Sequence, residues 1–222
     1  MDREIPGIEV DWASQLRGKQ YSNPEPKHRA AITTPKDVGK LMRAIEAYRD
    51  TSLVTSIAMR FSAFTFCRPG EIRHAEWTEI DWDEKLWRIP GSKMKMGQAH
   101  LVPLAKQALE LLRELREITG HKKYLFPTTW GSQKPMSEAT VLAALRRMDY
   151  DKEQMSAHGF RGMAATLLNE KGFNRDWIER QLAHSERNKV RAAYNHSEFL
   201  EDRRKMMQWW ASYLDELRDT EA

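Results

Sequence analysis

The chain has 222 residues, of which 41% are hydrophobic and 31% charged, enough apolar content for one sizeable core. Its formal charge of +4 makes it only mildly basic, so the places where basic residues cluster matter more than the total. The single cysteine, Cys67, excludes an intrachain disulfide and a cysteine-built metal site. The sequence has neither an apolar run of membrane-spanning length nor a signal peptide, which predicts a cytoplasmic protein.

The N-terminal region differs in texture from the rest of the chain. Residues 1–33 are rich in proline and polar residues and are expected to be a linker, the tail of a preceding domain. Helical periodicity begins at Thr34, a good N-cap residue, which Pro35 follows at the first helical position. The stretch 52–66 is apolar nearly all round and predicts a buried helix.

The central region carries the only strand-like pattern. Two β-type runs, 86–89 and 100–102, flank a polar centre with glycine and predict a small hairpin or three-stranded sheet. Helical periodicity then returns and persists over the segments 105–120, 137–148, 156–170, 174–184 and 197–219. The predicted fold is therefore α+β and mainly helical, with one small antiparallel sheet.

The segment "SAHGFRGMAATLLNEKG", residues 156–172, raises the first question of function. We expect Ser156 to cap a helix and Gly172 to end it. On that helix His158 and Arg161 are three residues apart and share a face in the first turn, where backbone N–H groups and the helix dipole favour an anion such as phosphate. Taken alone the spacing is common, and a structural role is the default interpretation.

An arginine occupies an unusual position in "TFCRPGEIRHAEW". Arg68 directly follows the predicted buried helix and precedes Pro69, which we expect to start another short helix. A charged residue between two rigid elements is anchored while its side chain still reaches a surface. Glu71, one turn on, is placed to hold the guanidinium. The alternative is an ordinary helix-terminal arginine.

Basic residues cluster around the predicted hairpin. Five Lys and Arg residues and no acid lie between Lys85 and Leu109, and Lys93 and Lys95 fall at the hairpin tip. A basic hairpin can enter a nucleic-acid groove and bring a lysine to a phosphate. The alternative is a solubilising turn.

Two further polar residues follow in the last third of the chain. His184 ends the predicted helix in "WIERQLAH", and Tyr194 lies ten residues later in "ERNKVRAAYNHSE". A lone histidine at a helix end is usually a cap, and a lone tyrosine usually belongs to the core. The sequence has no zinc-site spacing, glycine-rich phosphate loop or paired-carboxylate motif.

The order of these residues is more specific than any one of them. Arg, Lys, His-x-x-Arg, His and Tyr at these intervals resemble the tyrosine recombinases of phages and genomic islands over roughly residues 34–217. The matching boxes are "RPGEIRHAEWTEIDW", "KMKMGQAHLVPL", "HGFRGMAATLLNE" and "LAHSERNKVRAAYNH". The family's lysine precedes the proline of "VPL" by eight residues, which selects Lys95 and leaves Lys93 as the fallback. The resemblance implies a catalytic domain over 34–222, with a three-stranded antiparallel sheet beside a helical bundle.

The resemblance also implies a mechanism of DNA breakage and rejoining. Tyr194 would attack the scissile phosphate to form a 3′-phosphotyrosyl link, and Lys95 would protonate the leaving 5′-oxygen. The remaining expected roles are phosphate clamping by Arg68 and Arg161, proton movement assisted by His158, a phosphate hydrogen bond from His184, positioning by Glu71, and DNA contacts from Lys93, Lys95, Arg68 and Arg161. The resemblance implies no metal and no cofactor.

The same resemblance predicts partners. They are double-stranded DNA at attachment sites, further copies of the chain in a tetramer on DNA, and accessory DNA-bending proteins, in the bacterial cytoplasm with the nucleoid. The apolar face of the last helix either docks on a neighbouring protomer or packs on its own domain, and the isolated domain would then be a monomer. The alternatives are a type IB topoisomerase and a non-catalytic DNA-binding module of the same fold.

Of the six tyrosines, one other competes for the role of nucleophile. Tyr150 lies in a polar turn between Asp149 and Asp151, which would repel a phosphate. Tyr194 instead follows a basic stretch that would attract one, formed by Arg187, Lys189 and Arg191. A phenol needs positive surroundings to become a competent nucleophile, so Tyr194 is the predicted one.

Overall fold

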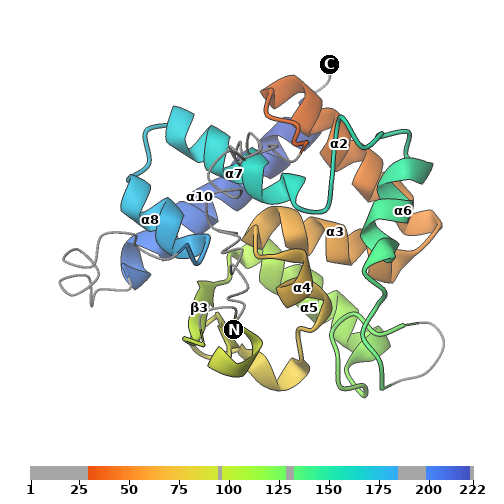
Figure 1. Ribbon diagram of the computed structural model, residues 1–222, viewed down its shortest axis with the longest axis vertical. Coiled ribbons are helices and arrows are strands. Elements are labelled where there is room, and N and C mark those ends of the chain that lie inside the picture. The colour runs from red at the N-terminus through yellow and green to blue at the C-terminus, as the bar shows by residue number, and fades with distance from the viewer. Residues whose placement is uncertain (1–29, 95–96, 129–132, 185–198, 221–222) are drawn as a thin grey trace, which may run out of the picture.

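The computed structural model describes residues 30–94, 97–128, 133–184 and 199–220. Its helices are α2 (Pro35–Ala47), α3 (Leu53–Thr65), α4 (Pro69–Arg73), α5 (Lys106–Thr119), α6 (Ala139–Arg147), α7 (Gly159–Glu170), α8 (Arg175–Gln181) and α10 (Leu200–Asp219) (Figure 1). The strands are β1 (Ile80–Asp81), β2 (Leu86–Ile89) and β3 (His100–Pro103). Within the described ranges there are also the 3₁₀ turns η1 (Tyr48–Asp50), η2 (Trp77–Glu79) and η3 (Gly91–Lys93).

The first helix begins where its sequence predicts. The Thr34 side chain accepts a hydrogen bond from the Asp37 backbone N–H, and Pro35 occupies the first helical position. The apolar stripe of α2 is buried, and Tyr48, just beyond the helix, is buried with it. Just before the helix, Ile32 packs against the same core.

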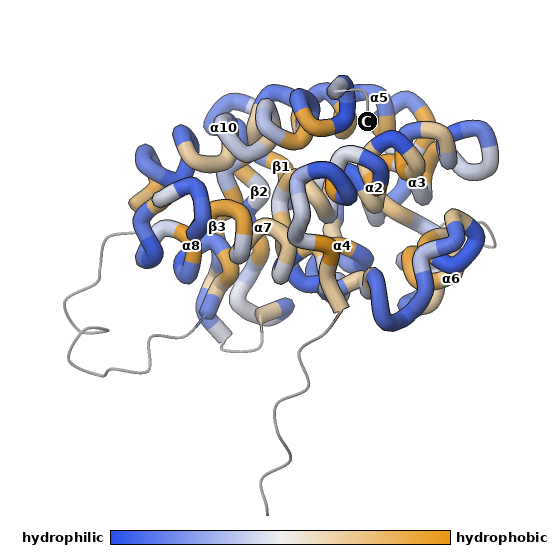
Figure 2. Tube along the Cα trace, turned by 90° about the horizontal axis from the view of Figure 1, so that it is seen from above, coloured by the Kyte–Doolittle hydropathy of each residue, from blue (hydrophilic) through white to orange (hydrophobic). Residues whose placement is uncertain are grey.

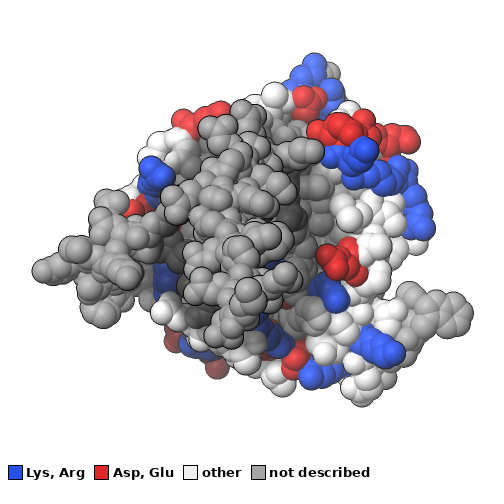
Figure 3. All heavy atoms as spheres, in the orientation of Figure 1, with Lys and Arg blue, Asp and Glu red and all other residues white. Residues whose placement is uncertain are grey.

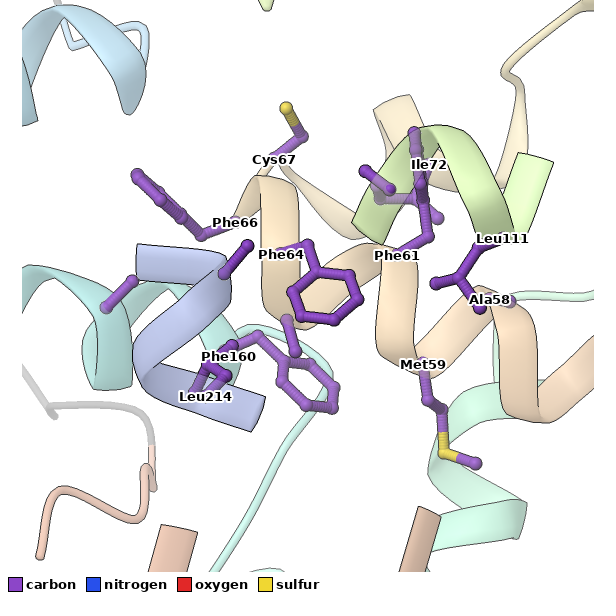
Figure 4. Packing of buried hydrophobic residues seen from close by; sticks show 14 of the residues in the cluster. Ala58, Met59, Phe61, Phe64, Phe66, Cys67, Ile72, Leu111, Phe160 and Leu214 are labelled. Atoms are coloured by element: carbon purple, nitrogen blue, oxygen red, sulfur yellow. The ribbon is translucent and has the colours of Figure 1, made fainter. Parts of the chain in front are cut away.

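Helix α3 lies at the centre of the fold and packs against α2, α4, α5, α6, α7 and α10. It is buried nearly all round, as its apolar sequence predicts. Figure 4 shows its side chains, among them Phe61 and Phe64, with Leu111 of α5, Phe160 of α7 and Leu214 of α10. Because α3 is rigidly packed, the residues that follow it are held in place.

The predicted small sheet is present and has three strands. The order is β1-β2-β3 and both pairs are antiparallel, with Ile80 opposite Trp87 and Trp87 opposite Val102. Trp87 is fully buried, and its ring lies 5.6 Å from that of Phe61 in α3. This contact fixes the sheet against the helical core.

The last helix packs on its own chain. Its buried residues include Met206 and Trp210, and the Trp210 indole N–H donates to the Ala63 carbonyl at 2.9 Å. The helix contacts α2 most extensively, and also α3, α5, α8 and β3. Figure 2 shows α10 and α5 along one side of the molecule, with α6 and α8 at opposite ends. This packing is within one chain, and docking of the helix on a neighbouring protomer stays a prediction.

Helix α7 begins later than predicted. Its N-cap is His158 and the first helical residue is Gly159, so the expectation that Ser156 caps the helix is wrong. The Ser156 hydroxyl instead donates to the carbonyl of Ala30 at 3.1 Å. A tertiary contact with the chain before α2 therefore overrides the local capping preference.

The predicted end of α7 is confirmed. Gly172 adopts the left-handed conformation (φ 80°), in which its N–H donates to the Asn169 carbonyl at 3.0 Å. The Phe173 N–H donates to the Leu168 carbonyl at 3.1 Å. These two bonds form a Schellman motif, in which glycine is favoured because it lacks a Cβ atom.

Candidate active site

Arg68 lies in the tight connection between α3 and α4. Phe66 ends α3 in the left-handed conformation (φ 40°), and Pro69 starts α4 directly after the arginine. The buried Glu71 carboxylate accepts from the Arg68 guanidinium at 2.8 Å and from its backbone N–H at 2.9 Å. The expected ion pair is therefore present, and it restrains the main chain and the side chain of Arg68 together.

Arg161 projects from the first turn of α7 into the interior. It is 9% exposed, and burial lowers the pKa of its guanidinium, which stays charged as arginine does in proteins. Its Nη1 donates to the Phe66 carbonyl at 2.9 Å. Phe66 is the C-cap of α3, so its carbonyl is not used within the helix and can accept from Arg161 of α7.

The end of α8 connects the two arginines. Arg68 Nη2 donates to the Ala183 carbonyl at 2.9 Å, and Arg161 Nη2 donates to the Leu182 carbonyl at 2.8 Å. Two consecutive carbonyls can face the two guanidinium groups because Ala183 is left-handed (φ 50°) and the chain turns sharply there. Arg68 and Arg161, which lie far apart in the sequence, are thereby held next to each other at the end of α8.

His184 completes this group of side chains. Its Nε2 lies 3.2 Å from Arg161 Nη2, and its Nδ1 lies 2.7 Å from a carboxylate oxygen of Glu179. The His184 side chain is 46% exposed, so its ring stands at the surface beside the buried arginine. Two guanidinium groups and an imidazole at one surface form a site suited to a tetrahedral oxyanion such as a phosphodiester.

His158 stands at the start of α7, three residues before Arg161. It is half-buried, and its backbone carbonyl accepts from the Arg161 N–H at 3.0 Å. The structure therefore joins His158 to the arginine through the first turn of the helix, although His158 itself is the cap residue and not part of the helix.

Lys93 is engaged by acidic residues at the base of the hairpin. Its Nζ donates to the His74 carbonyl at 2.9 Å, to Glu76 at 2.7 Å and to Glu79. Burial lowers the pKa of Lys93, but the hydrogen bonds to Glu76 and Glu79 outweigh that effect, and the pKa lies above its ordinary value. An ammonium held in this way is a poor proton donor.

The two remaining expected residues, Lys95 and Tyr194, lie outside the described residues. The hairpin is described up to Met94 and again from Gly97, whose N–H donates to the Met94 carbonyl at 3.0 Å. The tyrosine segment is bounded by His184 on one side and Phe199 on the other.

A buried polar network next to the site was not predicted. Gln181 is fully buried, and its amide donates to the Thr65 carbonyl at 3.1 Å while its side-chain oxygen accepts from the buried Arg203 at 2.7 Å. Arg203 also donates to the Leu101 carbonyl of β3. The network joins α3, α8, α10 and β3, and no local pattern in the sequence indicates it, because α8 (RDWIERQ) is mostly polar.

His100 belongs to the same buried region. It is 2% exposed and its Nε2 lies 3.2 Å from the Gln181 carbonyl. Burial, with the charges of Arg203 and Arg180, lowers the pKa of His100 to about 3. The imidazole is therefore neutral at physiological pH and serves the packing of β3 against α8.

The described surface is mixed in charge. On the face shown in Figure 3, Lys and Arg side chains lie beside acidic side chains toward the right-hand edge. Within the described ranges, no group of three or more His, Cys, Asp or Glu residues is arranged to hold a metal ion. None of the helices in the described part of the chain combines the length and hydropathy needed to cross a bilayer.

Comparison with known sequences identifies the family. The model of the phage integrase family matches residues 32–201. The integrase of Enterobacteria phage P4 is 46% identical over 223 residues, which cover 94% of this chain and 50% of that protein. The prophage integrase IntA of Escherichia coli K12 is 40% identical over 197 residues, which cover 89% of this chain and 47% of that protein. The chain spans about half the length of the curated relatives it matches.

Solved structures share the fold. The lambda integrase catalytic core aligns with a TM-score of 0.53 and 21% identity over 72% of this chain and 95% of that chain. The XerH site-specific recombinase bound to its difH substrate aligns with a TM-score of 0.57 and 20% identity over 78% of this chain and 52% of that chain. The predicted fold class, a mainly helical catalytic-domain fold with a small antiparallel sheet, is confirmed. Because the family model matches residues 32–201 of this chain and two relatives are 46% and 40% identical to it, the chain belongs to the phage integrase family.

Proposed function

We propose that this chain is the catalytic domain of a site-specific DNA recombinase, which integrates or excises a mobile element through a 3′-phosphotyrosyl intermediate. The observation that carries the proposal is the convergence of Arg68, Arg161 and His184 at the end of α8. The domain would extend over 34–222, and residues 1–33 would connect it to the rest of a longer protein. The named integrases among its relatives favour this function over a topoisomerase or a non-catalytic module.

The arginine pair would bind the scissile phosphate. Each guanidinium has five N–H donors, more than its contacts within the described residues use, so donors remain for the non-bridging oxygens. Both arginines are held by buried carbonyls or a buried carboxylate, and the site is therefore organised before DNA arrives. Donors fixed in advance stabilise the charge of the transition state without reorganisation.

The other groups would move protons or attack. Tyr194 would be the nucleophile and Lys95 would protonate the 5′-oxygen as it leaves, while His158 would assist proton transfer at the tyrosine. His184 would donate a hydrogen bond to the phosphate, and Glu71 would position Arg68. The bond energy is conserved in the tyrosyl intermediate, and rejoining is the reverse reaction with a different strand. This scheme requires neither a metal nor a cofactor.

The partners would be double-stranded DNA at attachment sites and further copies of the chain. The relatives of this fold include a lambda integrase tetramer bound to a Holliday junction, which supports a tetramer on DNA. Exchange of the C-terminal helix between protomers would require α10 to leave its position on α2. Accessory DNA-bending proteins and a location at the nucleoid in the cytoplasm complete the proposal.

The environments of three other tyrosines support the choice of Tyr194 as nucleophile. Burial and the charge of Asp37 raise the pKa of Tyr150, which makes its phenolate less accessible. Tyr48 and Tyr213 are buried in the core. These environments disfavour each of the three as the attacking residue.

The test is adduct formation on a nicked suicide substrate. Tyr194→Phe is expected to abolish the covalent protein–DNA adduct while the melting temperature and the affinity for DNA change little, because only the hydroxyl is lost. Tyr150→Phe is the matched control and should form the adduct. Mapping of the wild-type adduct to any tyrosine other than Tyr194 would overturn the assignment.

A further inference from the structure

The end of α8 has an unusual composition for its geometry. The Ala183 N–H donates to the Arg180 carbonyl and the His184 N–H to the Glu179 carbonyl, both at 3.1 Å. These are the two bonds of a Schellman motif, which brings the second residue after the cap against the third residue before it. In α8 those two residues are His184 and Glu179.

The same motif ends α7 and offers a comparison within one molecule. There the equivalent residues are Phe173 and Leu168, the apolar pair that usually accompanies the motif. In α8 the apolar pair is replaced by a histidine and a glutamate, joined by a hydrogen bond of 2.7 Å between His184 Nδ1 and the Glu179 carboxylate. The two backbone hydrogen bonds of the motif thus keep Glu179 next to the imidazole, although both side chains are partly exposed to solvent.

These contacts specify the protonation of the ring. The carboxylate of Glu179 can only accept, so Nδ1 of His184 carries a proton. Arg161 Nη2 can only donate, so Nε2 presents its lone pair to the arginine at 3.2 Å. The two contacts therefore place a proton on Nδ1 of His184 and direct the Nε2 lone pair toward Arg161.

We propose that Glu179 is a positioning residue for His184, which sets this tautomer and balances the charge that the ring acquires when a phosphate binds. The inference rests on the proposed function. To donate to a phosphate oxygen, Nε2 must give up its hydrogen bond from Arg161 and gain a hydrogen while Nδ1 keeps its own, so the ring takes one proton from solvent and becomes an imidazolium. The Arg161 N–H then donates to the phosphate as well. Glu179 then faces the positive ring on the side away from the phosphate, and the proton returns to solvent when DNA leaves.

The first experiment observes the tautomer directly. Two-bond ¹⁵N–¹H spectra of ¹⁵N-histidine-labelled protein, with His184 assigned by its loss in His184→Ala, should show a protonated Nδ1 and a bare Nε2. Glu179→Gln retains an acceptor and should keep this pattern, whereas Glu179→Ala should shift the ring toward the Nε2-protonated form. An unchanged His184 spectrum in Glu179→Ala would overturn the proposal.

The second experiment measures single-turnover adduct formation on the nicked substrate. We expect Glu179→Gln and Glu179→Ala each to slow it roughly tenfold, as loss of a residue that orients a functional histidine typically does. The double variant Glu179→Ala/His184→Ala should be within about twofold of His184→Ala, since a positioning residue has no effect without its histidine. Glu170→Gln, an exposed change at the end of α7, is the matched control and should react as the wild type does.

The two experiments separate this inference from the function it rests on. If the double variant is slower than His184→Ala by the full factor of Glu179→Ala, Glu179 acts independently of the ring and the proposal fails. If the wild type forms no adduct on any substrate, the proposed function fails, and the spectra alone decide whether Glu179 sets the tautomer of His184.

Discussion

Lys93 and Glu79 form an ion pair across the base of the β-hairpin, between the turn that precedes β1 and the turn that follows β2. The second carboxylate oxygen of Glu79 accepts from the Trp87 indole N–H at 2.9 Å. The Glu79 side chain is 8% exposed, so its charge depends on Lys93 for compensation. Lys93 therefore ties the hairpin to the core.

This pairing separates the two lysines of the hairpin in a cleavage assay. Lys95→Ala is expected to slow adduct formation far more than Lys93→Ala does, because only one lysine reaches the leaving oxygen. A substrate with a 5′-bridging phosphorothiolate has a sulfur that leaves without a proton, and it should restore the rate of the Lys95 variant. Rescue of the Lys93 variant with none for Lys95 would reverse the assignment.

The same pairing predicts a different defect for Lys93. Removing Lys93 leaves the carboxylate of Glu79 buried without its cation, so Lys93→Ala should destabilise the fold by about 2 kcal/mol. Urea unfolding measures this directly. Lys122→Ala, at a neighbouring turn, is a control expected to change stability by less than about 0.5 kcal/mol. Equal stabilities for the Lys93 variant and the wild type would show that the ion pair is not structural.

A third prediction concerns the left-handed residue at the site. Ala183 occupies the position of the Schellman motif where glycine is favoured, with φ at 50°. A Cβ atom makes this conformation cost about 1 kcal/mol, so Ala183→Gly should stabilise the protein by a comparable amount and raise its melting temperature by about 2–4 °C. The carbonyls that hold Arg68 and Arg161 should keep their places.

The control for Ala183→Gly uses an alanine in ordinary helical geometry. Ala143→Gly, in the interior of α6, should destabilise the fold by about 1 kcal/mol because glycine loses more backbone entropy there. Opposite signs for the two substitutions would support the geometry at the end of α8. A loss of stability from both would contradict it.

The packing of α10 gives a fourth prediction. A Cβ added at Gly39 of α2 would lie 2.3 Å from the Leu217 carbonyl oxygen of α10. Gly39→Ala must therefore push the two backbones apart and should cost about 1–3 kcal/mol in unfolding free energy. Gly70→Ala, where nothing lies within 4 Å of the added atom, is the control and should be close to neutral. A harmless Gly39→Ala would mean that α10 does not rest on α2 in solution.

Local signals predicted the fold well where neighbouring residues alone decide the structure. Thr34 and Pro35 start α2 and Gly172 ends α7, because each acts through its own backbone conformation. The prediction that Ser156 caps α7 was wrong because its hydroxyl donates to the carbonyl of Ala30, which lies more than a hundred residues away in the sequence. Such a contact leaves no pattern in the local sequence.

The sequence predicted the functional side chains of the candidate site, but not the backbone carbonyls and the carboxylate of Glu179 that hold them. The resemblance to tyrosine recombinases drew attention to Arg68, Arg161 and His184, yet the carbonyls that hold the arginines come from distant turns. Glu179 was not predicted as part of the site. Its hydrogen bond with His184 depends on the left-handed conformation of Ala183, which an alanine in the sequence does not indicate.

The last prediction is that DNA binding by this chain is weak and strongly dependent on salt. The chain spans about half the length of its relatives, and the charged side chains of the proposed site, Arg68 and Arg161, would contact phosphates and not base edges. Each phosphate neutralised contributes about 0.9 to the slope of log affinity against log salt, so Arg68→Ala should lower the slope by about one. Arg218→Ala is the control and should leave the slope unchanged. Arg218 pairs with Asp215 and lies about 22 Å along α10 from Arg203, the residue of this helix that contacts α8 beside the site. Fluorescence anisotropy from low to physiological salt measures both slopes, and tight binding that salt does not weaken would contradict a phosphate-dominated interface.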